Sequence, residues 1–281
     1  MHTFSTPQPI QLRVELWEGT ITVLAEQTDT TTVELVPEPG SDISQAQQLI
    51  DKTTVEQRGE EIVVLAPRVK GGLFRRGSQV HATIRVPLQS SAKVESGSAD
   101  IETRGALGDV QASSGSGDVH LASTADVQVR TGSGDITIDV VTGSCSTKSG
   151  SADVFIGSVA GDANVVTGSG DVMIDAVKAT LNVKSGSGDV LVKSGGDSVD
   201  ALAGSGDLML RRVDHGRVKA KTGSGDIAIG VANGTAAYLD VMTMSGDVRS
   251  DLNGSEGPGD AQQHVEIQVL SGSGDVLLQR A

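Results

Sequence analysis

The sequence predicts an all-β protein: a single-chain β-solenoid, of the parallel β-helix or β-roll type, with about 18 residues per coil. Three observations predict it. A Gly-Ser-Gly-Asp-Val motif recurs in ten copies, most of them 18 residues apart. Apolar and polar residues alternate on both sides of that motif, and the region that carries it has no competing helical period.

The aspartates of the motif set the register of the repeat. They are Asp100, Asp118, Asp135, Asp153, Asp171, Asp189, Asp207, Asp226, Asp247 and Asp275. Successive gaps are 18, 17, 18, 18, 18, 18, 19, 21 and 28 residues. The last gap holds the polar stretch DLNGSEGPGDAQQ, so we expect a surface loop near residues 250–264.

Period-two alternation predicts two strands per repeat. The residue after each Asp is branched and apolar, as Val172 is after Asp171, and the third residue after it usually is too, as Ile174. Six and eight residues before the Asp lie further apolar pairs, such as Leu181 with Val183. Two short strands and two turns fill one coil, and coils of this kind stack in parallel at about 4.8 Å.

The corner before each Asp has its own pattern. Glycine stands three residues before the Asp in nine of the ten copies, Met244 being the exception, and favours a sharp turn or a close backbone approach. Ser or Thr stands four residues before it, except at Ala203. Because alternate residues of a strand face opposite sides, that hydroxyl should face the core. We therefore expect it to form a hydrogen bond with a buried backbone group.

Residues 1–90 are expected to form a degenerate β-rich cap, and residues 91–281 the regular solenoid. VELWEGTITV at 14–23 resembles a repeat with Thr20 in the Asp position. In SDISQAQQLIDK, Asp42 precedes apolar residues at helical spacing, which predicts one short helix near 43–51.

Composition excludes several classes of function. A net charge of -14 and an aromatic content of 2% do not fit a protein that binds nucleic acid or an anionic membrane. The single Cys145 predicts packing rather than a disulfide or a zinc site. No signal peptide and no run of about 18 apolar residues is seen, so a cytoplasmic location is expected.

No catalytic, cofactor-binding or metal-binding residues are predicted, and no cofactor. The five histidines are scattered, and no GxSxG, HExxH or Walker motif occurs, so we expect no enzyme. The row of aspartates permits one alternative, a calcium-binding solenoid, although calcium solenoids of the nonapeptide type space Gly and Asp differently. The segment RVKGGLFRRG adds a basic island of Arg68, Lys70, Arg75 and Arg76, which we interpret as a solvated loop.

Three segments together resemble a known family. FSTPQPIQLRVELWEGTITV near the N-terminus, the recurring TGSGDI or SGSGDV, and the late AAYLDVMTMSGDVRSDL are similar to the bacterial putative adhesin family, in its actinobacterial branch without a signal peptide. The resemblance covers nearly the whole chain. It implies a β-solenoid and no established activity.

The sequence therefore favours a non-enzymatic scaffold that presents a flat, acidic repeat surface to another protein, as a monomer or small homo-oligomer. Two alternatives stay open. One is the cation-loaded Asp ladder. The other is a self-assembling, bactofilin-like filament subunit, whose end would be the coil around Val276 and Leu278.

Overall fold

The computed structural model describes residues 1–68, 79–252 and 263–281. The chain is all-β, with long stacks of parallel strands in two sheets and one helix among the described residues. This confirms the predicted fold class at that level. The chain divides into two compact units, residues 1–142 and 143–281, which are taken in turn.

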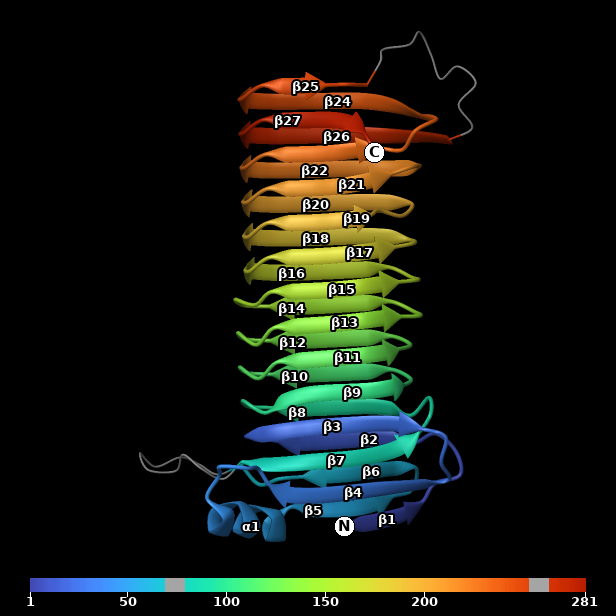
Figure 1. Cartoon of the computed structure of the whole chain (residues 1–281), viewed down its shortest axis with the longest axis vertical. Helices are drawn as coiled ribbons and strands as arrows, with labels where there is room; N and C mark the ends of the chain where they lie inside the picture. The colour runs from blue at the N-terminus through green and yellow to red at the C-terminus, as the bar shows by residue number, and fades with distance from the viewer. Residues whose placement is uncertain (69–78, 253–262) are drawn as a thin grey trace. The chain divides into compact units, whose positions relative to one another are not determined.

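The strands of residues 1–142 form two sheets (Figure 1). One has the order β1 (His2–Ser5), β4 (Thr30–Pro37), β7 (Val80–Pro87), β3 (Gly19–Glu26), β9 (Asp100–Ala106), β11 (Val119–Thr124) and β13 (Ile136–Val141). The other has the order β5 (Thr54–Arg58), β6 (Glu61–Leu65), β2 (Gln11–Leu16), β8 (Ser91–Ser96), β10 (Val110–Ser114) and β12 (Val127–Thr131).

The segment at 14–23 takes the place that its likeness to the repeat predicts. Strand β3 pairs in parallel with β9, and Thr20 lies opposite Asp100, so Thr20 does occupy the Asp position. Ile21 and Val23 are fully buried. On its other side β3 pairs with β7, so this segment lies between two strands that both follow it in the sequence.

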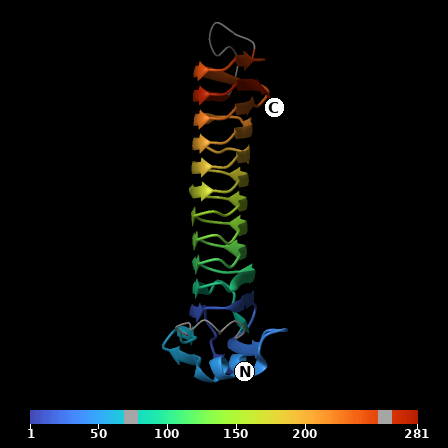
Figure 2. The ribbon, with the colours of Figure 1, turned by 90° about the vertical axis from the view of Figure 1, so that its left-hand side faces the viewer.

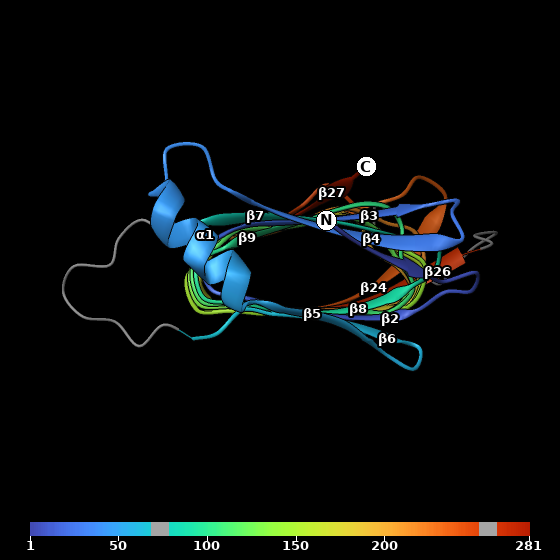
Figure 3. The same ribbon diagram turned by 90° about the horizontal axis from the view of Figure 1, so that it is seen from below.

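Antiparallel strands and a helix close the N-terminal end of this unit. Strand β4 pairs antiparallel with β1 and β7, and β5 pairs antiparallel with β6. Helix α1 (Ile43–Lys52) begins after Asp42, whose carboxylate accepts the Ser44 and Gln45 amides, and it packs against β4 and β7 (Figure 3). The predicted helix is thus confirmed, whereas the predicted domain boundary at residue 90 stays a prediction.

Residues 143–281 form two further stacks. The first, called the β15 sheet, has the order β15 (Val154–Val159), β17 (Val172–Val177), β19 (Val190–Ser194), β21 (Leu208–Val213), β23 (Ile227–Val231), β27 (Val276–Arg280) and β25 (Val248–Ser250). The second, the β14 sheet, has the order β14 (Cys145–Ser149), β16 (Ala163–Ser169), β18 (Thr180–Ser187), β20 (Ser198–Ser205), β22 (Gly216–Ser224), β26 (Gln263–Ser273) and β24 (Thr235–Ser245). Figure 2 shows these strands as two columns.

The register of the parallel pairs follows the repeat. Val172 lies opposite Val154 on one side and Val190 on the other, at separations of 18 residues. All three are buried, while Asp171 beside them is exposed. The inward positions of the two sheets thus build the core of this unit, as period two predicts.

The final repeat departs from the predicted order. Strands β26 and β27 lie between the coil of β22 and β23 and the coil of β24 and β25. The expectation that coils stack in sequence order, with Val276 and Leu278 at the end, is therefore wrong. Residues 235–250 form the last coil instead, and most of the predicted loop, 253–262, lies outside the described residues.

The last coil departs from the motif at a position where the other coils carry glycine. A Cβ at Gly272 would lie 2.5 Å from the Gly223 carbonyl oxygen of the adjacent strand, closer than any real contact. The corresponding residue in 235–250 is Met244, which carries a Cβ. Met244 lies in the last coil, where its side chain is 83% exposed.

Candidate interaction surface

Aspartates form a hydrogen-bonded row along the edge of the β15 sheet. The amide of Asp171 donates to Asp153 Oδ1 at 2.8 Å, and the amide of Asp189 donates to Asp171 Oδ1 at 2.9 Å. The pattern continues through Asp207, Asp226, Asp275 and Asp247 at 2.7–2.9 Å. Six of the seven carboxylates, all but that of Asp247 in the last coil, thus accept the amide of the Asp in the next coil. We call these seven residues the Asp row.

A row of apolar side chains runs beside the Asp row on the outer face of the same sheet. It consists of Phe155, Met173, Leu191, Met209, Ala228 and Leu277, each the partner of the next across neighbouring strands. Met173 is 39% exposed and Met209 42%, and the other four are half-buried. At about 4.8 Å per strand, six strands carry this apolar row over about 24 Å.

The sequence contained the signal for the apolar row. Its members stand two residues after the Asp in six of the seven motifs of residues 143–281, an outward position because alternate residues of a strand face opposite sides; after Asp247 this position is Arg249, which lies beside Leu277. Within residues 1–142 the same position holds Glu102, His120 and Thr137, which are also partners in register. The apolar row therefore belongs to residues 143–281 alone.

A mixed row borders the apolar row on its other side. It includes Asp175, Lys193 and Arg211, and the Lys193 ammonium lies 2.6 Å from an Asp175 carboxylate oxygen. Opposite charges offset each other there. Negative charge is therefore concentrated on the Asp-row side of the apolar row.

At the other corner of this unit, His215 lies between two carboxylates. Its Nδ1 is hydrogen-bonded to Asp214, and its Nε2 lies 3.0 Å from Asp197 Oδ1. Both hydrogen bonds raise the pKa of the His215 imidazole, and the bond to Asp214 has the larger effect. The sequence interpretation treated His215 as isolated, although its separation from Asp197 is one repeat, 18 residues.

The inward hydroxyls at the corners behave only partly as predicted. Thr131 Oγ1 accepts the Gly134 amide at 2.8 Å, and Ser114 Oγ accepts the Gly117 amide at 2.9 Å. These two buried hydroxyls satisfy backbone groups as expected. Ser149 Oγ and Ser185 Oγ are buried without a hydrogen-bond partner among the described residues.

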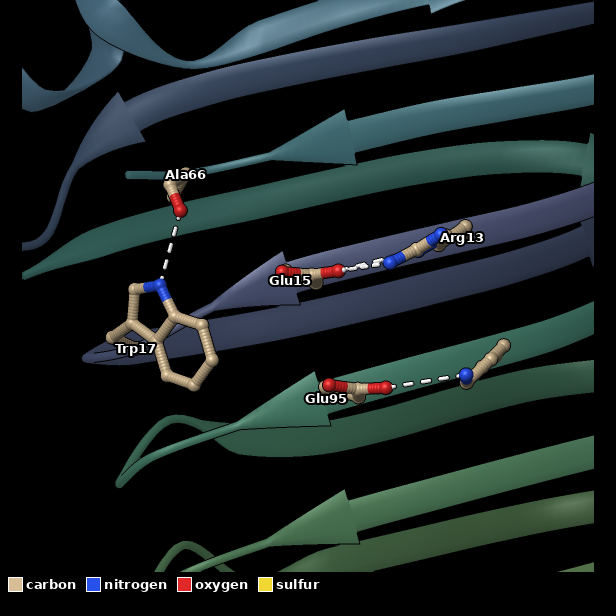
Figure 4. Close-up of polar contacts among 6 residues, drawn as sticks. Arg13, Glu15, Trp17, Ala66 and Glu95 are labelled. Atoms are coloured by element: carbon tan, nitrogen blue, oxygen red, sulfur yellow. Dashed lines mark hydrogen bonds and ion pairs between the residues drawn. The ribbon is translucent and has the colours of Figure 1, made fainter. Parts of the chain in front are cut away.

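The outer face of β2 and β8, in residues 1–142, carries paired charges. Arg13 lies 2.6 Å from Glu15, and Lys93 lies 3.3 Å from Glu95 (Figure 4). The hydrogen bonds that the Arg13 guanidinium donates to Glu15 Oε1 are the main cause of the raised pKa of Arg13. Because cations and carboxylates alternate here, this face offers no uniform charge to a partner.

Trp17 follows β2 and contacts two residues of the segment after β6. Its Nε1 donates to the Ala66 carbonyl oxygen at 3.0 Å (Figure 4), and the Arg68 guanidinium lies 3.9 Å from its ring centroid. Arg68, one of the four residues of the predicted basic island, thus stacks over the Trp17 ring. Lys70, Arg75 and Arg76 lie outside the described residues.

Cys145 is buried, in agreement with a packing role, and burial raises the pKa of its thiol to about 12.

Within residues 1–68, 79–252 and 263–281, no group of three or more His, Cys, Asp or Glu side chains is placed to hold a metal ion. The predicted lack of a metal site stays a prediction. No helix in the described part of the chain is long and apolar enough to cross a membrane.

Comparisons with known proteins find a matching family model and similar solved structures. The model of the Toastrack DUF4097 family matches residues 10–279. No curated protein matches the sequence. Among solved structures, a putative adhesin from Parabacteroides distasonis is 13% identical with a TM-score of 0.48, over 98% of this chain and 95% of that one. A putative adhesin from Bacteroides fragilis is 11% identical with a TM-score of 0.36, over 100% and 95%.

Proposed function

Since the chain belongs to the Toastrack DUF4097 family, we propose that it is a non-enzymatic β-solenoid of about 18 residues per coil that works as a protein-interaction scaffold. The observation that carries the proposal is the apolar row beside the Asp row in residues 143–281. Soluble proteins seldom expose a continuous apolar strip unless it meets a partner. The scattered histidines support a binding role over a catalytic one.

The two rows define the chemistry of the partner. A segment that covers the apolar row must present apolar side chains about every 5 Å, which one face of an α-helix does at 5.4 Å per turn. Lys or Arg along one flank of that helix would meet the Asp row. A length of about 24 Å corresponds to about 16 helical residues. The partner we propose is therefore a basic amphipathic helix of another protein.

A synthetic helix tests this proposal. The probe is a fluorescein-labelled 16-residue Leu/Lys peptide with its lysines on one flank of the apolar face, and binding is measured by fluorescence anisotropy. We expect saturable binding that weakens as salt rises, because exposed charges are screened. A peptide of the same design with Glu in place of Lys is expected to bind at least tenfold more weakly.

Matched variants separate the apolar row from general charge attraction. Met173→Ser with Met209→Ser removes two members of the apolar row and is expected to weaken binding at least fivefold. Leu202→Ser is the control, because Leu202 is 42% exposed, like Met209, but lies on the β14 sheet. Equal loss in the control, or equal binding of the Glu peptide, would contradict the proposed surface.

A further inference from the structure

The coil of β24 and β25, residues 235–250, leaves the core of its unit open. We call it the end coil. Strand β24 pairs with β26, and β25 pairs with β27 (Figure 1); no strand of the described residues pairs with the other edge of either. Among the described residues, both strands therefore present an edge whose backbone donors and acceptors have no strand partner; one acceptor of β24, Thr235 O, instead receives a hydrogen bond from the Arg280 side chain.

Core positions are exposed in the end coil. Leu239 is 43% exposed, whereas its partner Ile267 on β26 is fully buried. Val248 is 48% exposed, whereas its partner Val276 on β27 is fully buried. These positions face the core in the neighbouring coils, so water reaches apolar groups that one more layer of protein would cover.

Outward side chains enlarge this apolar end. Tyr238 is 52% exposed and Met242 60%. Protein edges are usually protected by Lys, Pro or a bulge, yet the eleven residues of β24 contain neither Lys nor Pro and carry one charge, Asp240. The N-terminal end of residues 1–142, by contrast, is closed by antiparallel strands and a helix.

We propose that the end coil binds the end coil of a second copy of this chain, with the two β24 strands antiparallel about a two-fold axis. Antiparallel pairing suits a two-fold axis because each strand then donates and accepts the same bonds. An axis through Val241 sets Asp240 opposite Met242 rather than opposite its own twin, and Tyr238 opposite Met244. It also brings the exposed Leu239 side chains into the joined core.

The size of the end coil limits the strength of the dimer. Eleven residues at about 3.3 Å each, on sheets about 10 Å apart, give a face of roughly 36 by 10 Å. That is about 360 Å² per copy and about 720 Å² in all, which is below the range of stable specific interfaces and typical of weak association. The net charge of -14 opposes approach of a second copy. We therefore expect a weak dimer, with a Kd between about 1 and 200 μM, that tightens as salt rises.

Sedimentation equilibrium of the full chain tests the dimer. Protein at 1–200 μM is compared in 0.15 and 0.5 M NaCl, with a monomer–dimer equilibrium expected at both salts and tighter association at the higher one. Tyr238→Lys with Met242→Lys places two cations on each edge and is expected to weaken association at least tenfold. Leu88→Lys with Leu202→Lys is the control, on exposed positions outside both the end coil and the apolar row.

A cysteine variant tests the geometry. Because directly opposed residues of an antiparallel pair lie about 5 Å apart, Val241→Cys is expected to give a disulfide-linked dimer on mild oxidation, and Leu202→Cys is not. Circular dichroism of each variant verifies that it is folded. A monomer at 200 μM in both salts, dimers indifferent to the lysines, or species that grow beyond dimers would each overturn the proposal, whatever the result with the helical peptide.

Discussion

At the scale of single residues, two neighbours in the repeat have opposite environments. Asp171 is exposed, and its Oδ1 accepts the Asp189 amide, whereas Val172 is 1% exposed and lies between Val154 and Val190. The side chain at 171 must accept a hydrogen bond, but it need not be charged for that. The side chain at 172 must be apolar.

Paired substitutions should separate these two requirements. Asp171→Asn keeps an acceptor and removes repulsion along the Asp row, so the free energy of unfolding should change by no more than about 1 kcal/mol. Val172→Asp buries a carboxylate and loses packing, which should cost several kcal/mol, on the order of 3 or more. Chemical denaturation measures both.

Asp171→Ala is the control that removes the acceptor, with an expected loss of about 1 kcal/mol. Equal tolerance of Asp171→Asn and Val172→Asp would show that the strand register is wrong. A large loss for Asp171→Asn alone would mean that the charge itself is needed, as it would be for a bound cation.

His215 gives the protein a small pH-dependent contribution to stability. Asp214 and Asp197 raise the pKa of His215 above its unfolded value of about 6.5. The stabilisation is therefore complete below about pH 6.5 and is lost as pH rises through the folded-state pKa. The His215 side chain is 43% exposed, so the effect should stay below about 1 kcal/mol.

The variant His215→Gln should reveal this contribution. The difference in unfolding free energy between the natural chain and the variant should be larger at pH 6 than at pH 8.5, as measured by urea denaturation. His264→Gln controls for the loss of a histidine as such. A difference that increases toward pH 8.5 would reverse the expected sign and refute the assignment.

At the scale of strands and coils, the alternation predicted which residues face the core. The sequence also predicted helix α1, because the N-terminal Asp42 and the helical spacing of Ala46 and Leu49 are local signals. It did not predict which coil neighbours which, because stacking of near-identical coils depends on long-range fit and the motif is the same in each. Two irregularities marked the last coil all the same: Met244 and Ser250 both break the pattern in residues 235–250.

The candidate surface was predictable to a similar degree. The Asp row follows directly from the motif, but its hydrogen bonds to the next coil required the stacking geometry. The residues of the apolar row, such as Phe155 and Met173, could be read from the sequence. Their interpretation as a binding surface required the positions of the Asp row and the mixed row on either side. Asp197 and His215 meet because one repeat separates them.

Two truncations should confirm the order of the last coils. Ile267 is fully buried in β26, so Ile267→Ala should cost about 2–5 kcal/mol of unfolding free energy. Leu239 is 43% exposed at the equivalent position of β24, and Leu239→Ala should cost less than about 1.5 kcal/mol. Denaturation at low protein concentration avoids any dimer. The opposite ranking would restore sequence order, with residues 263–280 at the end.

At the scale of the whole molecule, acidity and repetition decide how the protein responds to ions. The carboxylates of the Asp row recur on successive strands about 4.8 Å apart and repel by roughly 1 kcal/mol per pair in water. Any salt should therefore stabilise the fold by screening. A specific calcium site would need more, because Ca²⁺ takes six to eight oxygen ligands.

The Asp row is poorly arranged to supply those ligands. In six of the seven carboxylates one oxygen already accepts an amide, as Asp171 Oδ1 does from Asp189. The described residues also hold no cluster of three metal-binding side chains. We expect 1 mM calcium chloride, compared with EDTA in sodium chloride of equal ionic strength, to shift the melting temperature by no more than a few degrees. Stabilisation that saturates with calcium, and that Asp171→Asn diminishes, would instead establish preferential binding of the ion to the folded chain.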